Sequence, residues 1–433
     1  MPNESILQET LERIMSQNES VVFTLLSLDM FRTLNEGWGY FTGGKVYKEA
    51  SWAIQSFLTE KDTFFTIDHN KFAIITPTSL KTRQYHKLLK DMKNFFTHPI
   101  TIDHEIFEVT ASIGISSYPK DGIKASDIIE SANIALQWAR ISESHVNAAF
   151  YTGTVRDHQK NYTKLKRDLH YAADRGELFL EYQPQVDMKN NNIVGVEALL
   201  RWKREDGKII APMLFIPLAE SSGNITNLGD WVIKEVCLQA TKWRNKGINL
   251  RLSINISPVQ IYSDYYFFTK LQRELSNASI PTSIVDLEVT EKILQDHCGF
   301  LEKFIKQAQF MGMRVYLDDF GKGRSSIDFL RKFHFDGIKI DRSIITDIAD
   351  SSRNKKFANS LIQLAGSIAN YIVIEGVESN AQLEALHIDE GKTIIQGFLF
   401  SKPLRPEHIP SFISQYKKQP SFEGCQKLSN LTI

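Results

Sequence analysis

The chain has few cysteines and no long apolar run, and each of these absences excludes a class of protein. Its 433 residues include only three cysteines, Cys237, Cys298 and Cys425, with no CxxC or Cys/His ligand spacing among them. A disulfide framework and a thiolate zinc site are therefore not expected. The longest apolar runs fall far short of the ~20 residues that a membrane-spanning helix needs, and no signal-peptide pattern opens the sequence. We therefore expect a cytoplasmic protein without a membrane span.

Net charge is also absent. Lys and Arg together number 51, and Asp and Glu together also number 51. With no net field to attract DNA, RNA or an anionic membrane, none of these is expected as a partner, and an anionic ligand must be held by a local site. Since domains usually run to ~100–200 residues, the length predicts two domains.

The first domain is predicted over residues 1–152 as a compact α/β unit, because short apolar runs alternate with helical patterns. The strands are expected at 21–28, 63–67, 72–76 and 109–116, and the helices at 45–58, 83–95 and 125–140. A polar stretch at 153–161 is interpreted as a linker, and a charged amphipathic helix near 162–175 opens a second domain at 162–420, followed by a tail at 421–433.

The second domain has the pattern of a TIM-like β/α barrel. Eight apolar, strand-like runs occur, mostly with helical segments between them, at 178–186, 193–202, 250–257, 285–290, 314–319, 337–341, 371–377 and 393–398. In such barrels the ligand site lies at the carboxyl ends of the strands. Polar residues that interrupt these runs are therefore the candidates for function.

Polar side chains interrupt six of the eight runs. In the run 193–202, strand alternation places Glu197, Leu199 and Arg201 on one face, so a carboxylate and a guanidinium share a side. The other interruptions are Asn255, Glu288, Asp318, Asp319, Lys339 and Glu375. Buried carboxylates in separate ion pairs are the alternative, but there are too few cations to neutralise them. The pattern therefore predicts a polar barrel mouth.

The predicted mouth carries more negative than positive charge. Asp318 and Asp319 can both reach it only if their strand ends there, and Gly321 allows the chain to turn at once. Their carboxylates, with those of the other strands, would repel one another unless divalent cations bind. Carboxylate oxygens and the amide oxygen of Asn255 suit Mg²⁺ or Mn²⁺, with Ca²⁺ a nonproductive competitor. Two such ions ~4 Å apart serve phosphodiester hydrolysis.

These residues stand in motifs that resemble the EAL domain of cyclic di-GMP phosphodiesterases. The motifs are YQPQ at 182–185, EALLRW at 197–202, FIPLAE at 215–220, NIS at 255–257, LEVTE at 287–291, DDFG at 318–321, KID at 339–341, EGVE at 375–378 and QGFLFSKPL at 396–404. The resemblance implies hydrolysis of cyclic di-GMP to linear pGpG with two Mg²⁺ or Mn²⁺ ions, and a homodimer formed through this domain.

The resemblance also implies a role for each matching residue. The metal ligands would be Glu197, Asn255, Glu288, Asp318, Asp319 and Glu375. Lys339 would hold the attacking water, and Glu375 and Glu291 would complete the catalytic group, Glu291 by stabilising the loop after the DD pair. Arg201 would bind a substrate phosphate, while Gln183 and Gln396 would line the mouth. Lys322 and Arg324 depart from the family, which usually has Thr and Tyr at these positions.

The first domain resembles a GGDEF domain, the diguanylate cyclase fold, through SLDMFRTLNEGWGYFTGG at 27–44, NKFAII at 70–75 and SIGISSYPKDG at 112–122. Its chemistry is predicted to be lost, because Ser27 and Asn70 replace acidic metal ligands and Gly44 replaces an aspartate that recognises guanine. Asn35 and Arg140 keep polar positions, which leaves GTP as a possible regulatory ligand. We expect an inactive regulatory or dimerising module.

Two alternatives to the phosphodiesterase remain. A non-catalytic receptor would bind cyclic di-GMP and signal through protein partners, but such receptors usually lack several metal ligands, and here all the matching positions are filled. A cyclase is disfavoured by Ser27, Gly44 and Asn70. The sequence therefore favours the hydrolase.

Overall fold

The computed structural model describes residues 2–418, except 30, 69, 104, 108, 142–145, 264–265, 292, 294–297, 323–326 and 389–391. The chain divides into two compact units, Met1–Leu165 and Lys166–Ile433. In the described part of the chain, none of the helices is both long and apolar enough to cross a bilayer. Cys237 is a buried free thiol, while Cys425 lies outside the described residues.

A mixed five-stranded sheet forms the first unit. Its order is β2 (Thr63–Asp68), β3 (Lys71–Thr76), β1 (Val21–Leu28), β6 (Ala111–Tyr118) and β7 (Val146–Phe150). Strand β1 is antiparallel to both of its neighbours, and only β6 and β7 run parallel. Every residue of β1 is buried, because helices cover both faces of the sheet.

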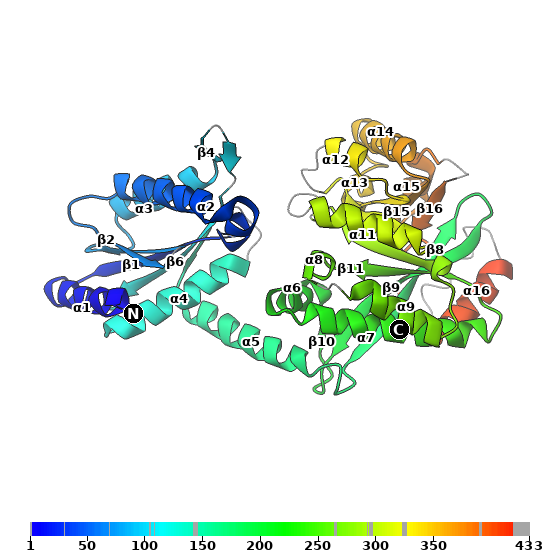
Figure 1. The fold of residues 1–433 in the computed structure, drawn as a ribbon, viewed down its shortest axis with the longest axis horizontal. Helices are drawn as coiled ribbons and strands as arrows, with labels where there is room; N and C mark the ends of the chain where they lie inside the picture. The colour runs from blue at the N-terminus through cyan, green and yellow to red at the C-terminus, as the bar shows by residue number, and fades with distance from the viewer. Residues whose placement is uncertain are drawn as a thin grey trace. The chain divides into compact units, whose positions relative to one another are not determined.

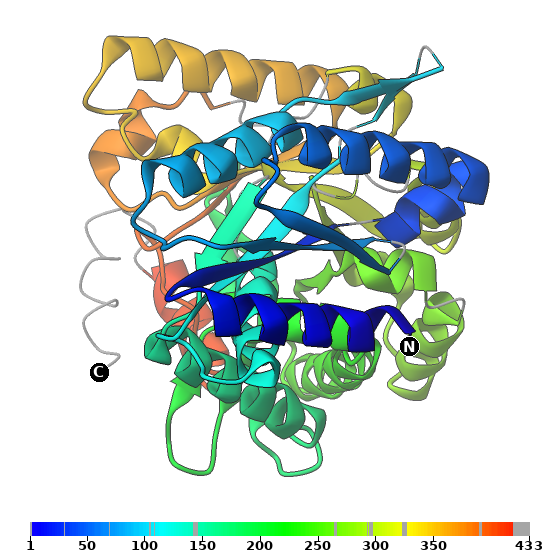
Figure 2. The ribbon, with the colours of Figure 1, turned by 90° about the vertical axis from the view of Figure 1, so that its left-hand side faces the viewer.

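Two pairs of helices sandwich this sheet (Figures 1 and 2). Buried side chains of α2 (Phe31–Ser56) and α3 (Arg83–Phe96) pack on one face, together with Val22 and Leu26 of β1. Those of α1 (Pro2–Gln17) and α4 (Ala125–Ile141) pack on the other face, with Phe23 and Leu25. The hairpin of β4 (Ile100–Ile102) and β5 (Glu105–Phe107) is a separate small sheet.

The four strands and three helices predicted for the first unit are present, but the predicted bounds were incomplete. Helix α2 begins at Phe31 rather than near residue 45. Four glycines at 37, 39, 43 and 44 hid its first half, since glycine is a poor helix former. Helix α1 and strand β7 were missed altogether. Helix α1 packs on the sheet and β7 is its edge strand, so both are peripheral elements.

The segment 153–161, which the sequence suggested was a linker, is helical. Helix α5 runs from Gly153 to His170, so it includes that segment and ends five residues before the predicted helix does. The polar composition of this segment is that of a helix with a low mean hydropathy, which is typical of one exposed to solvent.

The second unit is a closed barrel of eight strands, as predicted. Around the ring the order is β9 (Asn192–Lys203), β11 (Arg251–Ile256), β12 (Val285–Thr290), β13 (Arg314–Phe320), β14 (Gly337–Ile340), β15 (Tyr371–Glu375), β16 (Thr393–Gln396) and β8 (Leu178–Asp187). The seven strands of the ring other than β8 are mutually parallel, whereas β8 is antiparallel to both β9 and β16.

The reversed direction of β8 was not predicted, although its cause is local. The connection between β8 and β9 contains only the four residues 188–191, and a parallel crossover needs a dozen or more. Asn191 at its end has φ +49°, a left-handed conformation typical of a tight turn. As a result, the first residues of β8 lie at the end of the barrel where the parallel strands terminate.

Helices cover the outside of the barrel (Figure 1). They are α6 (Pro212–Ser222), α7 (Ile225–Arg244), α8 (Pro258–Ser263), α9 (Phe267–Asn277), α11 (Cys298–Phe310), α12 (Ile327–Lys332), α13 (Arg342–Ile345), α14 (Ser352–Ile368), α15 (Asn380–Ala385) and α16 (Ile409–Lys418), with a short hairpin strand β10 (Ile209–Ile210) and the 3-10 helix η1 (Thr282–Ile284). The outward-facing Leu180 and Tyr182 of β8 pack into this layer, so their neighbours along the strand face the barrel interior.

Candidate active site

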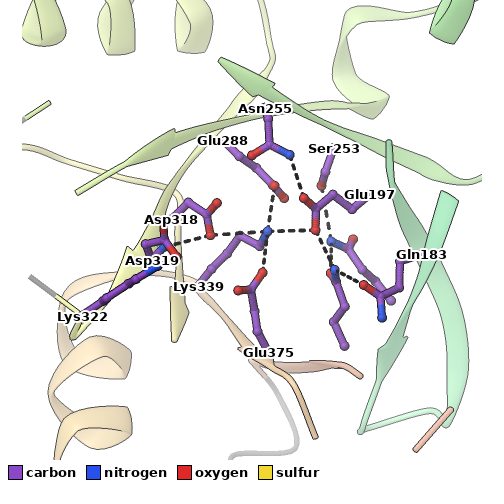
Figure 3. A network of polar contacts seen from close by, with 12 residues as sticks. Gln183, Glu197, Ser253, Asn255, Glu288, Asp318, Asp319, Lys322, Lys339 and Glu375 are labelled. Atoms are coloured by element: carbon purple, nitrogen blue, oxygen red, sulfur yellow. Dashed lines mark hydrogen bonds and ion pairs between the residues drawn. The ribbon is translucent and has the colours of Figure 1, made fainter. Parts of the chain in front are cut away.

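Lys339 of β14 lies at the centre of a buried cluster of carboxylates (Figure 3). Its side chain has no solvent exposure. The ammonium lies 2.7 Å from both Glu288 and Glu375, 3.1 Å from Glu197 and 3.5 Å from Asp318. These side chains come from five strands, so the barrel itself brings together residues that are far apart in the sequence.

Four carboxyl groups share one ammonium, so three negative charges would be uncompensated if all four were ionised. Burial, reinforced by the charge of Glu197, raises the pKa of Glu288 well above its ordinary value. Burial likewise raises the pKa of Asp318, against the attraction of Lys339, and raises that of Glu375 to about 8. Burial opposes the charge of Lys339, but its carboxylate neighbours raise its pKa, so the ammonium stays protonated.

Glu197 is the best-supported anion of the cluster. Asn255 donates to it at 2.7 Å and Gln396 at 2.6 Å. Burial opposes its ionisation, but Lys339 and these two hydrogen bonds together lower its pKa. Glu197 therefore remains a carboxylate.

Glutamines of the adjacent strand β8 hold Gln396, one of the two donors to Glu197, in place. Gln396 donates to Gln183 at 3.1 Å and accepts from Gln185 at 3.0 Å. Gln185 also donates to Ser253 at 3.4 Å. The sequence analysis singled out Gln183 and Gln396 but not Gln185 or Ser253. Gln185 stands two residues beyond Gln183, so strand alternation would have placed it on the same face.

Asp318 and Asp319 both reach the site, but not because the strand ends there. Strand β13 continues to Phe320, and its pairing with β14 shifts between Leu317 and Phe320. Asp319 has φ +58°, which is unusual for a residue other than glycine. A bulge of this kind changes the direction in which a side chain points. The bulge, rather than the predicted strand end, therefore directs both carboxylates towards the site.

A second acidic pair lies beside the Lys339 cluster. The Asp319 and Asp341 side chains are hydrogen-bonded to each other, and burial together with Asp318 raises the pKa of Asp319 to about 6. Lys322 is 3.8 Å from Asp319, and both side chains are partly exposed. Asp341 was missed as a site residue, although it follows Lys339 by two positions in the KID motif. Arg324 lies outside the described residues.

Glu291 anchors the turn that follows the aspartate pair. Its backbone N–H donates to the carbonyl of Asp318 at 3.0 Å, and its carboxylate accepts from the N–H of Gly321 at 3.2 Å. Gly321 has φ +98° and no room for a Cβ beside Ile344. Glu291 therefore fixes the backbone on both sides of Asp319.

Arg201 lies apart from the carboxylate cluster. It donates to Glu181 of β8 at 2.8 Å, and both side chains are partly exposed. Arg201 stands four residues beyond Glu197 on β9, towards the carboxyl end of the strand. Arg201 therefore belongs to the rim of the barrel, where a ligand can approach it.

The carboxylate cluster has the chemistry of a divalent-cation site. One oxygen of Glu288 is buried and has no hydrogen-bond partner, which is costly unless a cation or water meets it. The donors are hard oxygens, which suit Mg²⁺ or Mn²⁺. Among the described residues no three acidic, imidazole or thiol side chains already form a metal cage. Because Lys339 lies between the carboxylates, they would have to turn towards an ion.

In the first unit, the positions at which the GGDEF resemblance implies metal ligands have little negative charge. Ser27 accepts hydrogen bonds from Arg140 and, at 3.5 Å, from Asn70. Arg140 also lies 3.6 Å from Asp29, which accepts from Ser112 at 2.8 Å. Burial raises the pKa of Asp29. The guanidinium of Arg140 therefore occupies the space between Ser27 and Asp29. The side chain of Asn35 is not among those described.

Known proteins resemble both units. The model of the diguanylate cyclase GGDEF domain matches residues 1–145. "Signaling protein YkoW" of Bacillus subtilis is 29% identical over 418 residues, which cover 96% of this chain and 52% of that protein. "Cyclic di-GMP phosphodiesterase PdeR" of Escherichia coli is 29% identical over 424 residues, covering 97% of this chain and 63% of that protein. The chain thus spans half to two thirds of the length of these relatives.

Solved structures resemble the barrel as well. A structure described as the PaMucR phosphodiesterase in complex with c-di-GMP is 34% identical, has a TM-score of 0.53, and covers 57% of this chain and 99% of its own. The EAL domain model matches residues 166–403, more than half of the chain. The chain belongs to the EAL domain family, and its EAL domain follows a GGDEF domain in tandem.

Proposed function

We propose that the second unit is a phosphodiesterase that hydrolyses cyclic di-GMP to linear pGpG with two Mg²⁺ or Mn²⁺ ions. The observation that carries the proposal is the cluster of Glu197, Glu288, Asp318 and Glu375 around Lys339, in which four buried carboxyl groups share a single ammonium. The printed names of PdeR and of the PaMucR complex, a phosphodiesterase with c-di-GMP, support it.

The proposed metal ligands are those of the barrel mouth. They are Glu197, Asn255, Glu288, Asp318, Asp319 and Glu375, with Asp341 as an addition from the structure. Bound ions would stabilise charge on the phosphodiester and lower the pKa of a bound water. Asn255 now donates to Glu197 through its amide nitrogen, so its amide oxygen is left to act as a ligand.

The positions of the remaining site residues suggest a role for each of them. The ammonium of Lys339 donates to an attacking water and holds it against the phosphorus. Arg201, at the rim, binds a phosphate oxygen of the substrate, with Glu181 holding its guanidinium in place. Gln183 and Gln396 keep Glu197 oriented. Glu291 acts only by fixing the turn at Gly321.

We propose that the first unit does not synthesise cyclic di-GMP and acts as a regulatory or dimerising module. Ser27 and Asn70 are neutral, and Arg140 is bonded to Ser27, where a carboxylate would be needed to hold a cation. A GTP molecule that binds there would regulate hydrolysis without being consumed.

The decisive experiment incubates the purified chain with cyclic di-GMP and either Mg²⁺ or Mn²⁺ and separates the products by chromatography. We expect linear pGpG to accumulate, and none to form with EDTA. Binding of cyclic di-GMP with no product under any of these conditions would instead identify a receptor. Sedimentation of the same samples tests whether the chain is a homodimer.

A further inference from the structure

An aromatic ring and an arginine form a stacked pair at the rim of the barrel, outside the carboxylate cluster. Because β8 is antiparallel to its neighbours, its first residues lie at the carboxyl ends of the parallel strands, where barrel sites form. Phe179 of β8 pairs in register with Arg201 of β9. Strand alternation gives Phe179 the same face as Gln183, and Gln183 contacts the site through Gln396.

The chain that leaves β16 places Arg405 over this ring. Leu404 and Tyr182 exchange two backbone hydrogen bonds of 2.7 and 2.9 Å, which fixes the returning segment beside β8. The guanidinium carbon of the next residue, Arg405, lies 3.5 Å from the centre of the Phe179 ring. A planar guanidinium over a ring keeps its N–H donors at its edges.

The guanidinium N–H groups of Arg405 form no hydrogen bond within the described part of the structure. Whereas Arg201 donates to Glu181 at 2.8 Å, no described side chain forms a hydrogen bond or ion pair with the guanidinium of Arg405. Both Phe179 and Arg405 are partly exposed. The stack thus orients a cation whose hydrogen-bonding edge remains available to a ligand at the rim.

We propose that Arg405, held flat on Phe179, recognises a guanine base of the substrate; this rests on the proposed function. The O6 and N7 atoms of guanine are both acceptors, and they match the two parallel donors of an arginine. Arg201 is the register partner of Phe179, about 5 Å away across the strand pair. One nucleotide unit would place its phosphate on Arg201 and its base on Arg405.

The test uses a substrate analogue that changes a single acceptor. In cyclic di-GMP built from 7-deazaguanine, N7 is replaced by a C–H group, while the charge and phosphates are unchanged. KM and kcat are measured for both dinucleotides with the parent chain, Arg405→Ala and Arg405→Lys. Arg331→Ala is the matched control, because Arg331 is exposed at the end of α12, before β14 begins, and therefore lies towards the opposite end of the barrel.

For cyclic di-GMP we expect Arg405→Ala to raise KM about tenfold or more, with kcat within about twofold of the parent. The parent should discriminate against the deaza analogue, and both Arg405 variants should lose most of that discrimination, since lysine keeps the charge but not the paired donors. Arg331→Ala should behave as the parent does. Melting temperatures of all variants check that the fold is retained.

Two results would overturn the role of Arg405 and leave the phosphodiesterase standing. One is an unchanged KM in Arg405→Ala. The other is a raised KM with the parent's discrimination between the two dinucleotides, which would mean that Arg405 contributes charge alone. A parent chain that neither binds nor hydrolyses cyclic di-GMP would overturn the proposed function itself, and the inference with it.

Discussion

Lys339 donates to one oxygen of Glu288 at 2.7 Å, while the other oxygen of the same buried carboxylate has no partner. A single ammonium can satisfy only part of the carboxylate cluster, and the unsatisfied remainder is what a divalent ion would complete. Folding alone does not require such an arrangement, because a well-packed apolar core of the same volume is often at least as stable. The cluster is therefore best explained by ligand binding.

Glu197→Gln should abolish hydrolysis while keeping the fold. The substitution is isosteric but removes the charge of the most strongly supported carboxylate, so we expect kcat to fall by about a hundred- to a thousandfold, the usual cost of removing one preorganised electrostatic group. Mn²⁺ binding, followed by electron paramagnetic resonance, should weaken as well. Hydrolysis at the parent rate would show that Glu197 is not a metal ligand.

Lys339→Met should separate stability from catalysis. Removing the ammonium leaves buried carboxylates without a cation, which should cost about 3–5 kcal/mol of unfolding free energy in EDTA. Mg²⁺ should restore part of that loss, because ions binding only the folded state stabilise it by mass action. Hydrolysis should stay low, because Lys339 is proposed to hold the attacking water. Denaturant melts with and without Mg²⁺ give the answer, and a variant equally stable in EDTA would contradict the central role of Lys339.

Lys322→Thr should strengthen metal binding. Lys322 lies 3.8 Å from Asp319 and competes electrostatically with any ion that this carboxylate holds. Since both side chains are partly exposed, the effect should be small, about two- to fivefold in the dissociation constant of Mn²⁺. Calorimetric titration of the metal without substrate measures it. Lys356→Thr, at an exposed position on α14, is the control for a lost charge.

How much the sequence reveals differs between the two units. In the barrel, the strand runs and the motifs alone singled out Glu197, Glu288, Lys339 and Glu375, and the structure brings these four side chains together. The antiparallel direction of β8 follows from its short connection to β9, which the predicted bounds already left at six residues, but the barrel pattern was interpreted without using that length. For that reason the rim position of Phe179 required the structure.

The backbone conformation of Asp319 also could not be predicted from the sequence. That Asp318 and Asp319 act together was expected, but the sequence suggested a strand end, whereas the chain uses a bulge with Asp319 at φ +58°. Aspartate adopts this conformation more often than most residues other than glycine do, but nothing in the sequence singles out Asp319 for it, because tertiary contacts such as those of Glu291 stabilise the turn. Asp341 was missed for a related reason, since its pairing with Asp319 depends on the bulge.

Restoring a carboxylate to the first unit tests why it is expected not to synthesise cyclic di-GMP. GTP supplied with Mg²⁺ should give no cyclic di-GMP, because phosphoryl transfer needs ligands that hold metal at the triphosphate, and Ser27 and Asn70 are neutral. In the parent chain, Arg140 donates to Ser27 and lies 3.6 Å from Asp29. In Ser27→Asp the same arginine would pair with the new carboxylate and compete with a metal ion.

We therefore expect Ser27→Asp alone to remain inactive as a cyclase, and its effect on Mn²⁺ binding to appear only in combination with Arg140→Ala. Equilibrium dialysis of Mn²⁺ with the single and double variants distinguishes these cases, and their non-additivity measures the coupling between the two residues. In the hydrolysis assay, GTP can alter the rate only if it binds two states of the protein unequally. Cyclic di-GMP formed from GTP by the parent chain would contradict the proposal, whereas a rate unaffected by GTP would restrict the first unit to a structural role.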